Sequence, residues 1–328
     1  MSSRVLLVRL DGVGDAMVAA PLVAALTSAG HSVGAVLTTR NAQCFNEGAF
    51  VARHVVERVP WPAHASTPQT RVRALAEIRA ARYDVALIAS EEPEAYGYAK
   101  EGGIATRIGF WNGVERPLKS LWIAMQCTRL VHRPATLPRA PQHEVEALYA
   151  LGAGYVNETA PTKDAQRLRA LIASGPIVRT GTLAIQCTKK WMEIGCGLED
   201  VVGWLACFAG RRDVMLFASA HEAAFAREVA GRTKLPLRVF ESVRAWVDAI
   251  ASAGMLLTPD TGGAHVAGML GVPTVDVFAR DRFAEHAARW RPWAAPARTL
   301  AAPAPGDAAN FGAVLGVALD SLGFALPA

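Results

Sequence analysis

The sequence predicts an α/β protein made of two doubly wound, Rossmann-like domains that face each other across a cleft. Short runs rich in leucine and β-branched residues alternate with longer alanine-rich helical patterns, as in parallel sheets covered by helices. This alternation starts again after a polar stretch at residues 157–182, which predicts a linker. A length of 328 residues fits two domains, which we expect at residues 1–165 and 166–328.

The individual elements follow from the same pattern. In the first half we expect strands at residues 5–10, 32–38, 85–89 and 107–110, and helices at 15–29 and 71–82. In the second half we expect strands at residues 183–187, 213–218, 237–240, 255–258 and 274–278, and helices at 198–209, 220–233, 243–253, 263–270 and 311–322. Ligands of such sheets bind at the carboxyl ends of the strands, so two facing sheets suit an enzyme that joins two substrates.

Composition narrows the class of protein. The chain is 52% hydrophobic and 19% charged with a net charge of +5, so it can bury a large core and has no basic tail for nucleic acid. The charged N-terminal run is too short for a signal peptide, and no apolar run approaches the roughly 20 residues that span a bilayer. The 5 cysteines include no CxxC pair, which predicts reduced thiols of a cytosolic protein rather than disulfides or metal ligands.

The stretch "LLTPDTGGAHVAGMLGVPTVDVF", residues 256–278, carries the strongest chemical signal. A strand ends before Asp260, and Thr261, Gly262 and Gly263 lead into a helix with His265 in its first turn. The N–H groups and dipole of a helix start attract anions, and glycines allow a phosphate to approach the backbone. The alternative is an ordinary helix capped by Asp260 or Thr261, with His265 as a core residue.

A second signal, "CTKKWMEIG" at residues 187–195, follows the first strand of the second half. Lys189 and Lys190 lie where a diphosphate would meet them, and Trp191 is expected to pack beneath them. The alternative interpretation is a solvated loop.

The stretch "VRLDGVGDAM", residues 8–17, occupies the place of a phosphate loop but carries two carboxylates, Asp11 and Asp15. A dinucleotide fingerprint requires G-x-G-x-x-G/A; Gly12 and Gly14 satisfy its start, but Met17 stands at its sixth position. The second strand ends in "LTTR" without the acidic residue that binds a ribose, and Asp15 would repel a pyrophosphate. A NAD(P)-dependent oxidoreductase is therefore disfavoured.

These three motifs, a "GD" loop, a Lys-x-Trp and an Asp-Thr-Gly-x-x-His before "GVPTV", come in this order along the chain. In this the chain resembles the ADP-heptose:lipopolysaccharide heptosyltransferases of glycosyltransferase family 9, which have the GT-B fold. The resemblance implies an inverting transfer of heptose from ADP-heptose to the inner core of lipopolysaccharide, without metal or cofactor. It also implies a cytoplasmic enzyme peripheral to the inner membrane, with an N-terminal acceptor domain that carries the catalytic loop and a C-terminal donor domain.

The resemblance also implies roles for single residues. Asp15 matches the proposed general base and Lys189 the lysine that faces the donor diphosphate. The donor-binding motif covers Asp260, Thr261, Gly262, Gly263 and His265, and Glu222 matches loosely a glutamate near the nucleoside.

Three positions depart from the family pattern: Met192 replaces a proline, Ala279 a glycine, and Asp11 a small hydroxyl residue. They leave open another GT-B nucleotide-sugar enzyme, such as a different hexosyl- or heptosyltransferase or an epimerase. A non-catalytic binder is disfavoured because it has little use for Asp15.

The acceptor side is expected in a basic segment of the first domain. Residues 100–140 hold seven basic and two acidic side chains, a net charge of +5 (7 − 2), and a lipopolysaccharide core carries carboxylates and phosphates. We expect Arg107, Arg116 and Lys119 to bind the acceptor. We also expect Asp11 to orient the loop or an acceptor hydroxyl, and Gly14 to leave space for the acceptor. The alternative is a dispersed, solvated surface.

Overall fold

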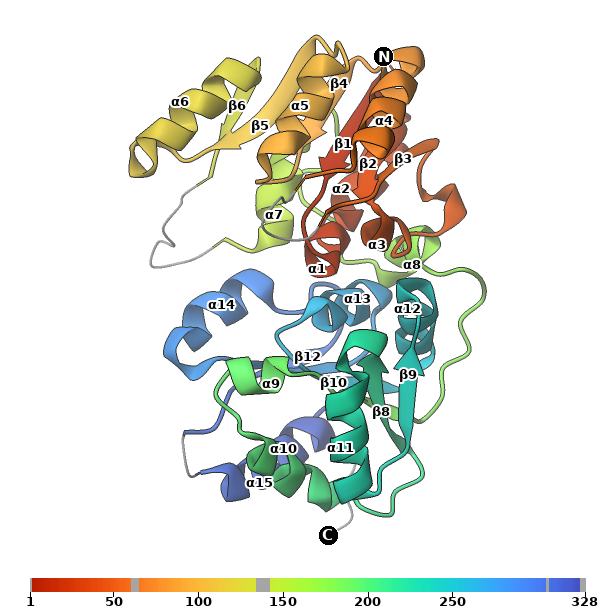
Figure 1. Ribbon diagram of the computed structural model, residues 1–328, viewed down its shortest axis with the longest axis vertical. Helices are drawn as coiled ribbons and strands as arrows, with labels where there is room; N and C mark the ends of the chain where they lie inside the picture. Colours follow the sequence, from red (N-terminus) through yellow and green to blue (C-terminus); the bar gives the residue numbers. More distant parts are fainter. Residues whose placement is uncertain (1, 60–64, 134–141, 305–306, 325–328) are drawn as a thin grey trace. The chain divides into compact units, whose positions relative to one another are not determined.

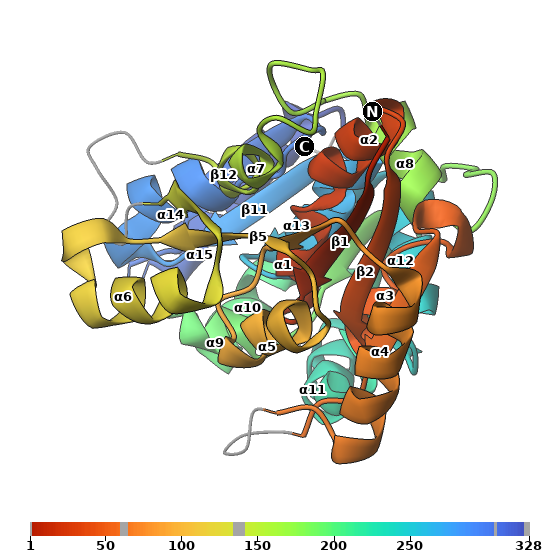
Figure 2. The same cartoon turned by 90° about the horizontal axis from the view of Figure 1, so that it is seen from above.

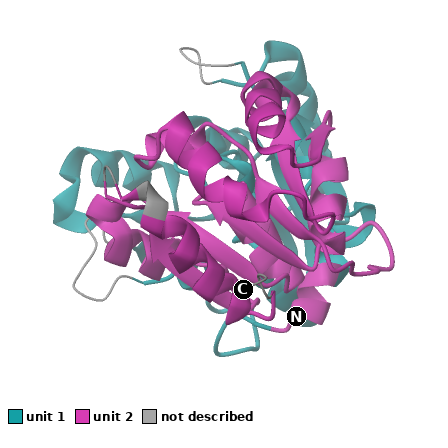
Figure 3. Ribbon diagram, turned by 90° about the horizontal axis from the view of Figure 1, so that it is seen from below, with its two compact units in different colours: residues 1–163, 170–172 teal, residues 164–169, 173–328 magenta. Residues whose placement is uncertain are grey.

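The computed structural model describes residues 2–59, 65–133, 142–304 and 307–324. It divides into two compact units, shown in teal and magenta in Figure 3. Unit 1 holds Met1–Lys163 and Ala170–Ile172, and unit 2 holds Asp164–Arg169 and Ala173–Ala328. The predicted boundary between residues 165 and 166 falls inside helix α8 (Ala165–Ile172), which the two units share.

Unit 1 is built on one parallel sheet of six strands in the order β3-β2-β1-β4-β5-β6 (Figure 1). The strands are β1 (Arg4–Arg9), β2 (Ser32–Thr38), β3 (Ala52–Val56), β4 (Val85–Ile88), β5 (Thr106–Trp111) and β6 (Arg129–His132). Its helices are α1 (Val13–Met17), α2 (Ala20–Ser28), α3 (Thr39–Ala42), α4 (Pro68–Ala81), α5 (Pro93–Glu101), α6 (Pro117–Gln126) and α7 (Glu144–Tyr149). Short 3₁₀ helices are η1 (Glu47–Ala49), η2 (Gly113–Glu115) and η3 (Ala150–Gly152).

Unit 2 repeats this plan with a parallel sheet in the order β12-β11-β10-β7-β8-β9. The strands are β7 (Leu183–Gln186), β8 (Val214–Ser219), β9 (Leu237–Phe240), β10 (Met255–Pro259), β11 (Thr274–Phe278) and β12 (Ala297–Ala301). The helices are α9 (Lys190–Glu193), α10 (Leu198–Leu205), α11 (Ala223–Thr233), α12 (Val243–Ser252), α13 (Gly262–Leu270), α14 (Phe283–Trp290) and α15 (Ala308–Asp320), with η4 (Ala206–Phe208), η5 (Ala220–Glu222) and η6 (Arg280–Arg282).

Both sheets have the doubly wound strand order. When the strands of each unit are numbered along the chain, both orders read 3-2-1-4-5-6. The chain winds in opposite directions from the central pairs β1–β4 and β7–β10, and ligands of such sheets bind at that switch point, beyond the carboxyl ends of the strands. The topology therefore directs attention to the loops that follow these four strands.

The structure confirms the predicted α/β class, and every predicted strand is present within about one residue of its expected bounds. Three edge strands, β3, β6 and β12, were missed. The helix expected at residues 15–29 is interrupted, because α1 ends at Met17 and α2 begins at Ala20 with Pro21 in its first turn.

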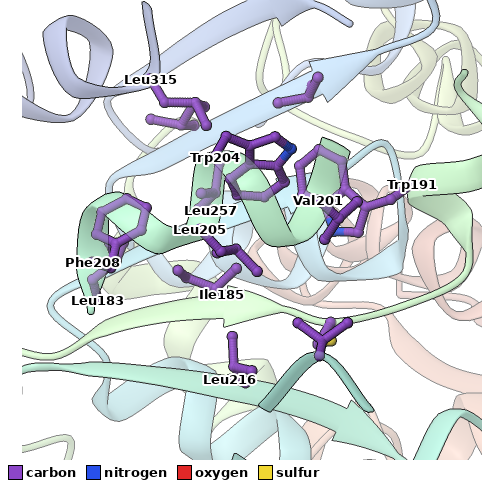
Figure 4. Packing of buried hydrophobic residues seen from close by; sticks show 14 of the residues in the cluster. Leu183, Ile185, Trp191, Val201, Trp204, Leu205, Phe208, Leu216, Leu257 and Leu315 are labelled. Carbon is purple, nitrogen blue, oxygen red and sulfur yellow. The ribbon is translucent and has the colours of Figure 1, made fainter. Parts of the chain in front are cut away.

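The core of unit 2 lies beneath the second motif (Figure 4). Trp191 is fully buried, and its ring centroid lies 4.9 Å from that of Trp204, which in turn lies 6.1 Å from that of Phe311. The indole N–H of Trp191 donates to the backbone carbonyl of Gln186 at the end of β7, 2.9 Å away. The tryptophan of the Lys-x-Trp motif thus anchors the loop after β7 to the core.

Candidate active site

The first candidate residue, Asp15, lies in the first turn of α1, immediately after the loop that follows β1. One carboxylate oxygen, Oδ2, accepts a hydrogen bond from the backbone N–H of Gly12, the N-cap residue, at 3.1 Å. This is the back-reaching half of a capping box, and the helix dipole favours a negative charge at this position. The side chain of Asp15 is 35% exposed, so a substrate can reach its carboxylate.

A buried arginine fixes the other carboxylate oxygen. Arg9, the last residue of β1, is 2% exposed, and its Nη2 lies 3.0 Å from Oδ1 of Asp15. Its Nε donates to the backbone carbonyl of Asp15 at 2.8 Å, and its Nη1 donates to the carbonyl of Ala89, just after β4. One planar guanidinium therefore joins the carboxyl ends of both central strands and orients the carboxylate.

Asp11 lies in the same cluster. Its Oδ2 is 3.4 Å from Nη1 of Arg9, and this buried oxygen has no hydrogen-bond partner among the described residues. Asn41 of α3 is buried, and its side-chain amide donates to the carbonyl of Asp11 at 2.8 Å and to that of Arg9 at 3.4 Å. The two carboxylates of the "VRLDGVGDAM" stretch thus share one buried cation in a loop held from both sides.

A second charged cluster follows β4 and was not predicted. The carboxylate of Glu91 lies 2.8 Å from Nζ of Lys119 and 3.2 Å from Nη1 of Arg133, and Arg133 also pairs with the buried Glu144 at 2.7 Å. Burial by itself would raise the pKa of Glu91, but the hydrogen bond from Lys119 and the nearby positive charges together lower it below its usual value. Glu91 comes 28 and 42 residues before these partners, so nothing local in the sequence indicates the cluster.

The basic residues predicted for the acceptor do not all lie together. Lys119 already pairs with Glu91, and Arg116 is exposed just before α6, after the carboxyl end of β5. Arg107 lies instead near the amino end of β5, where its guanidinium donates to the carbonyls of Gln126 and Ile104 at 2.7 and 2.8 Å. Arg139, counted in the same basic segment, falls outside the described residues.

In unit 2 the predicted anion site is the start of α13. Thr261 is the N-cap, and its Oγ1 accepts from the N–H of Gly263 at 3.2 Å while its carbonyl accepts from Ala264 at 3.1 Å. The N–H of Gly262 has no partner in the described part of the chain. Oγ1 of Thr261 also lies 2.9 Å from Oγ1 of the buried Thr258, which fixes the hydroxyl. The helix start therefore keeps one N–H donor available to a ligand.

The glycine and histidine of this motif have packing roles as well. A Cβ on Gly263 would lie 3.3 Å from Oγ1 of Thr261 and 3.4 Å from Cζ2 of Trp246, so a side chain would crowd the turn. His265 is 6% exposed, and its ring packs edge to face on Trp290 with centroids 5.6 Å apart. The structure thus agrees with the capped-helix interpretation of this turn without removing its capacity to bind an anion.

The loop after β7 meets the segment after β8. Oγ1 of Thr188 donates to one carboxylate oxygen of Glu222 at 3.0 Å, and the N–H of Lys189 donates to the other at 3.4 Å. Lys190 pairs with Glu193 at 3.0 Å, whereas the exposed ammonium of Lys189 has no partner among the residues that the structure describes. The structure therefore distinguishes the two lysines, and it places Glu222 beside the lysine loop.

Sequence reasoning missed a buried acid, Asp276 of β11. It lies in register with Thr258 of β10, and neither carboxylate oxygen has a hydrogen-bond partner among the described residues. Burial, and to a lesser degree the charge of Asp260, raises the pKa of Asp276 well above its ordinary value of 3.8. This environment favours the neutral acid beneath the start of the anion-site loop.

Other expectations concern cysteines, metals and membranes. All five cysteines are free thiols in the structure. Burial raises the pKa of Cys187 to about 12 and those of Cys127 and Cys196 to about 11. Among the described residues no group of three His, Cys, Asp or Glu side chains could hold a metal ion. Within the same ranges, no helix is both long and apolar enough to cross a bilayer.

No sequence-family profile matches this chain, and no curated protein sequence does. Solved structures do resemble it over nearly its full length. A glycosyltransferase family 9 protein of Veillonella parvula is 15% identical, with a TM-score of 0.71 and coverage of 98% of this chain and 97% of that one. The Escherichia coli heptosyltransferase WaaC, solved with ADP, is 18% identical, with a TM-score of 0.76 and coverage of 97% and 99%.

The ADP-heptose lipopolysaccharide heptosyltransferase II of Escherichia coli is 14% identical, with a TM-score of 0.68 and coverage of 97% of this chain and 98% of that one. At these identities the likeness is one of fold. It confirms the two-domain GT-B fold and the resemblance that the sequence motifs indicated.

Proposed function

We propose that this protein is an inverting glycosyltransferase that transfers heptose from ADP-heptose to the inner core of lipopolysaccharide. The observation that carries the proposal is the carboxylate of Asp15, partly exposed at the switch point of unit 1 and held by a buried arginine. A partly exposed carboxylate at this position has no role in cradling a phosphate, but it is a group that can remove a proton from an attacking hydroxyl.

The reaction follows from that role. An acceptor hydroxyl attacks the anomeric carbon of the donor, and its proton passes to the carboxylate of Asp15 while the bond from carbon to the diphosphate oxygen breaks. Attack from the face opposite the leaving group inverts the anomeric configuration. A positioned base contributes typically about 10²–10⁴-fold to such a step. Asp11 shares the same arginine and is proposed to orient the loop or an acceptor hydroxyl, with Gly14 leaving room for the acceptor.

The donor is proposed to bind unit 2. Its diphosphate would accept a hydrogen bond from the N–H of Gly262 and would contact Thr261 at the start of α13. The exposed ammonium of Lys189 would face the departing diphosphate. Charge grows on the diphosphate in the transition state, so this lysine stabilises that state more than the bound donor. Glu222, Asp260, Gly263 and His265 complete the proposed donor site, and the ADP in the WaaC structure supports an adenine nucleotide.

The acceptor is proposed to bind unit 1. Arg116 is exposed beyond the carboxyl end of β5 and is available to a carboxylate or phosphate of the core, while the charge of Lys119 is shared with Glu91. Arg107 is excluded from this proposal because its guanidinium serves backbone carbonyls at the other end of the strand. The enzyme is proposed to act in the cytoplasm at the surface of the inner membrane, where this acceptor is anchored.

A different nucleotide-sugar enzyme on the same fold is the second candidate. It is favoured by Met192 and Asp11, which depart from the family pattern beside the donor lysine and in the catalytic loop. A NAD(P)-dependent oxidoreductase and a non-catalytic binder are less well supported.

Calorimetric titration with ADP, UDP and NADH separates these candidates, followed by assay of ADP release from ADP-heptose with a lipopolysaccharide core acceptor. We expect micromolar binding of ADP, no comparable binding of UDP or NADH, and stabilisation by about 2.7 kcal/mol at a hundredfold excess of ADP over its Kd. A preference for UDP or NADH would overturn the donor assignment. ADP binding without transfer would overturn the acceptor assignment.

A further inference from the structure

Helix α6 of unit 1 carries an apolar stripe on its solvent side. Leu118, Leu121 and Met125 are 84%, 62% and 60% exposed, and Val114 in the preceding η2 is 93% exposed. The spacing of three and four residues places Leu118, Leu121 and Met125 along one edge of α6. Val114 lies in η2, which precedes the helix and is separated from it by Arg116, whose backbone is not helical. Isolated exposed leucines are common, but four largely exposed apolar side chains between residues 114 and 125 are not.

The opposite side of α6 accounts for its attachment to the domain. Ser120 and Ile123 are buried, and the rim residue Trp122 packs edge to face on Tyr96 with ring centroids 5.0 Å apart. The helix packs on β5 and beside α5, and Figures 1 and 2 show it, in yellow, at the outer edge of the unit 1 sheet. Helix α6 therefore has apolar side chains on two sides. The described residues of unit 1 cover the inner side and leave the outer side exposed.

Basic side chains flank the stripe. Between Thr106 and Arg133 the sequence holds five basic residues and one acidic residue, Glu115. Lys119 and Arg133 share their charges with Glu91 and Glu144, so the exposed Arg116 is the basic group that is most available beside the stripe. Arg116 is exposed directly before the helix, and Lys119 follows Leu118 on the rim. No acidic residue lies within α6 itself. This combination of an aliphatic stripe and basic flanks complements an anionic lipid surface.

The size of the stripe favours a lipid surface over a protein partner. A helix of 10 residues is about 15 Å long, and four aliphatic side chains bury roughly 300–500 Å². A stable protein interface needs about 800 Å² from each partner and is centred on Trp, Tyr or Arg anchors, which this stripe lacks. A bilayer does not need a surface of complementary shape, and each aliphatic side chain that enters it adds separately to the binding free energy.

We propose that the stripe formed by Val114, Leu118, Leu121 and Met125 docks the protein on a membrane rich in anionic lipid. The helix would lie parallel to the bilayer surface with this stripe among the acyl chains and with Arg116 and Lys119 at the headgroups. The choice of a membrane rests in part on the proposed function, since a lipid-anchored acceptor would be met there. The stripe and its charges do not depend on that function.

The test is co-sedimentation of the full chain with vesicles of phosphatidylcholine, with and without phosphatidylglycerol. Leu121→Asp is compared with Val72→Asp, which places the same charge at a 68% exposed position on α4 of the same unit. We expect binding to the anionic vesicles, weaker binding to the neutral ones, a loss of about tenfold or more in Leu121→Asp, and less than about twofold in Val72→Asp. Thermal melting checks that both variants are folded.

Absence of vesicle binding by the unchanged protein, or equal binding by the two variants, overturns the proposal. A dimer that Leu121→Asp dissociates, without vesicle binding, also overturns it and identifies a second copy as the occupant. ADP titration of the same samples reports on the proposed function separately. Loss of ADP binding with intact vesicle binding would count against the transferase alone.

Discussion

Arg9 donates two hydrogen bonds to Asp15, one to its carboxylate at 3.0 Å and one to its backbone carbonyl at 2.8 Å. The arginine lies at the end of β1, and the aspartate lies in the first turn of the next helix. A single buried cation therefore sets both the path of the loop and the direction of the proposed base. The following predictions start from this pair.

Replacing Asp15 by asparagine tests the proposed base. The amide keeps one oxygen that can accept from Arg9 or from the N–H of Gly12, so we expect a folded protein with normal ADP affinity. Turnover should fall about a hundredfold or more, because an amide cannot take up the proton of the acceptor. Steady-state assay and calorimetry measure the two effects. Asp11→Asn removes the same charge from the same cluster and should cost far less turnover; the reverse ranking would assign the base to Asp11.

Replacing Arg9 tests the cation beneath the loop. Arg9→Met leaves Asp11 and Asp15 without their shared partner, and we expect the free energy of unfolding to fall by about 3 kcal/mol. Arg9→Lys keeps the charge but loses the planar fork, so stability should fall less, while turnover drops and ADP affinity stays unchanged. Urea unfolding, steady-state assay and ADP titration give the three readouts. Wild-type turnover in a folded Arg9→Lys protein would show that the fork does not position the base.

The two lysines after β7 should behave differently. Lys189→Ala should lower turnover by about tenfold or more, because the free ammonium of Lys189 is the one proposed to face the leaving diphosphate. Lys190→Ala removes an exposed ion pair with Glu193 and should change both stability and turnover little. Parallel kinetics of the two variants make the comparison, and equal loss in both would contradict the role given to Lys189.

The buried acid Asp276 predicts a pH dependence of stability. Its folded-state pKa is raised above 3.8, so the native state binds the proton more tightly than the unfolded chain does. Its contribution is fully present below pH 3.8 and is lost as the pH rises towards the raised pKa. Relative to the unchanged protein, Asp276→Asn should therefore gain stability as the pH rises from 4 to 7 in urea unfolding. The exposed Asp281→Asn serves as the control and should show a flat difference.

Charge reversal separates the two arginines of the basic segment. Arg116→Glu should raise the KM for the acceptor several-fold and leave ADP affinity intact, since this side chain is exposed beyond the carboxyl end of β5. Arg107→Glu should instead lower the free energy of unfolding by about 1–3 kcal/mol, because the carbonyls of Gln126 and Ile104 lose their charged donor. Normal acceptor kinetics in Arg116→Glu would remove this residue from the proposed site.

The sequence allowed the central strands to be predicted because each contains a run of apolar residues. β1, β4 and β10 are buried on both faces and read as continuous hydrophobic runs. The missed strands β3 ("ARHVV"), β6 ("RLVH") and β12 ("ARTLA") are all edge strands that are only partly buried, and their mixed composition resembles that of a loop. Local pattern reports burial, so it is weaker for edge strands; of the four edge strands, only β9 was predicted.

The same limit applies to the candidate site. The glycines, Asp15 and the Thr261 cap were predicted because they lie beside strand ends and helix starts, which have local signatures. The partners that give these groups their properties were not predicted. Arg9 reads as one more residue of a strand, and the salt bridges of Glu91 join segments far apart in the chain. Such pairings depend on strand order, which a single sequence does not state.

The shared helix α8 has a practical consequence for separating the units. Arg169, the last residue of α8 that belongs to unit 2, donates to the carbonyl of Leu270 at the end of α13, 2.7 Å away. The last three residues of α8 belong to unit 1, where the carbonyl of Leu171 accepts a hydrogen bond from the N–H of Asn46 at 2.9 Å. A proteolytic or engineered cut at any single bond in α8 would leave at least one of the two fragments without its hydrogen bond to this helix. Two independently folded fragments would therefore have to overlap, each keeping its own copy of Ala165–Ile172.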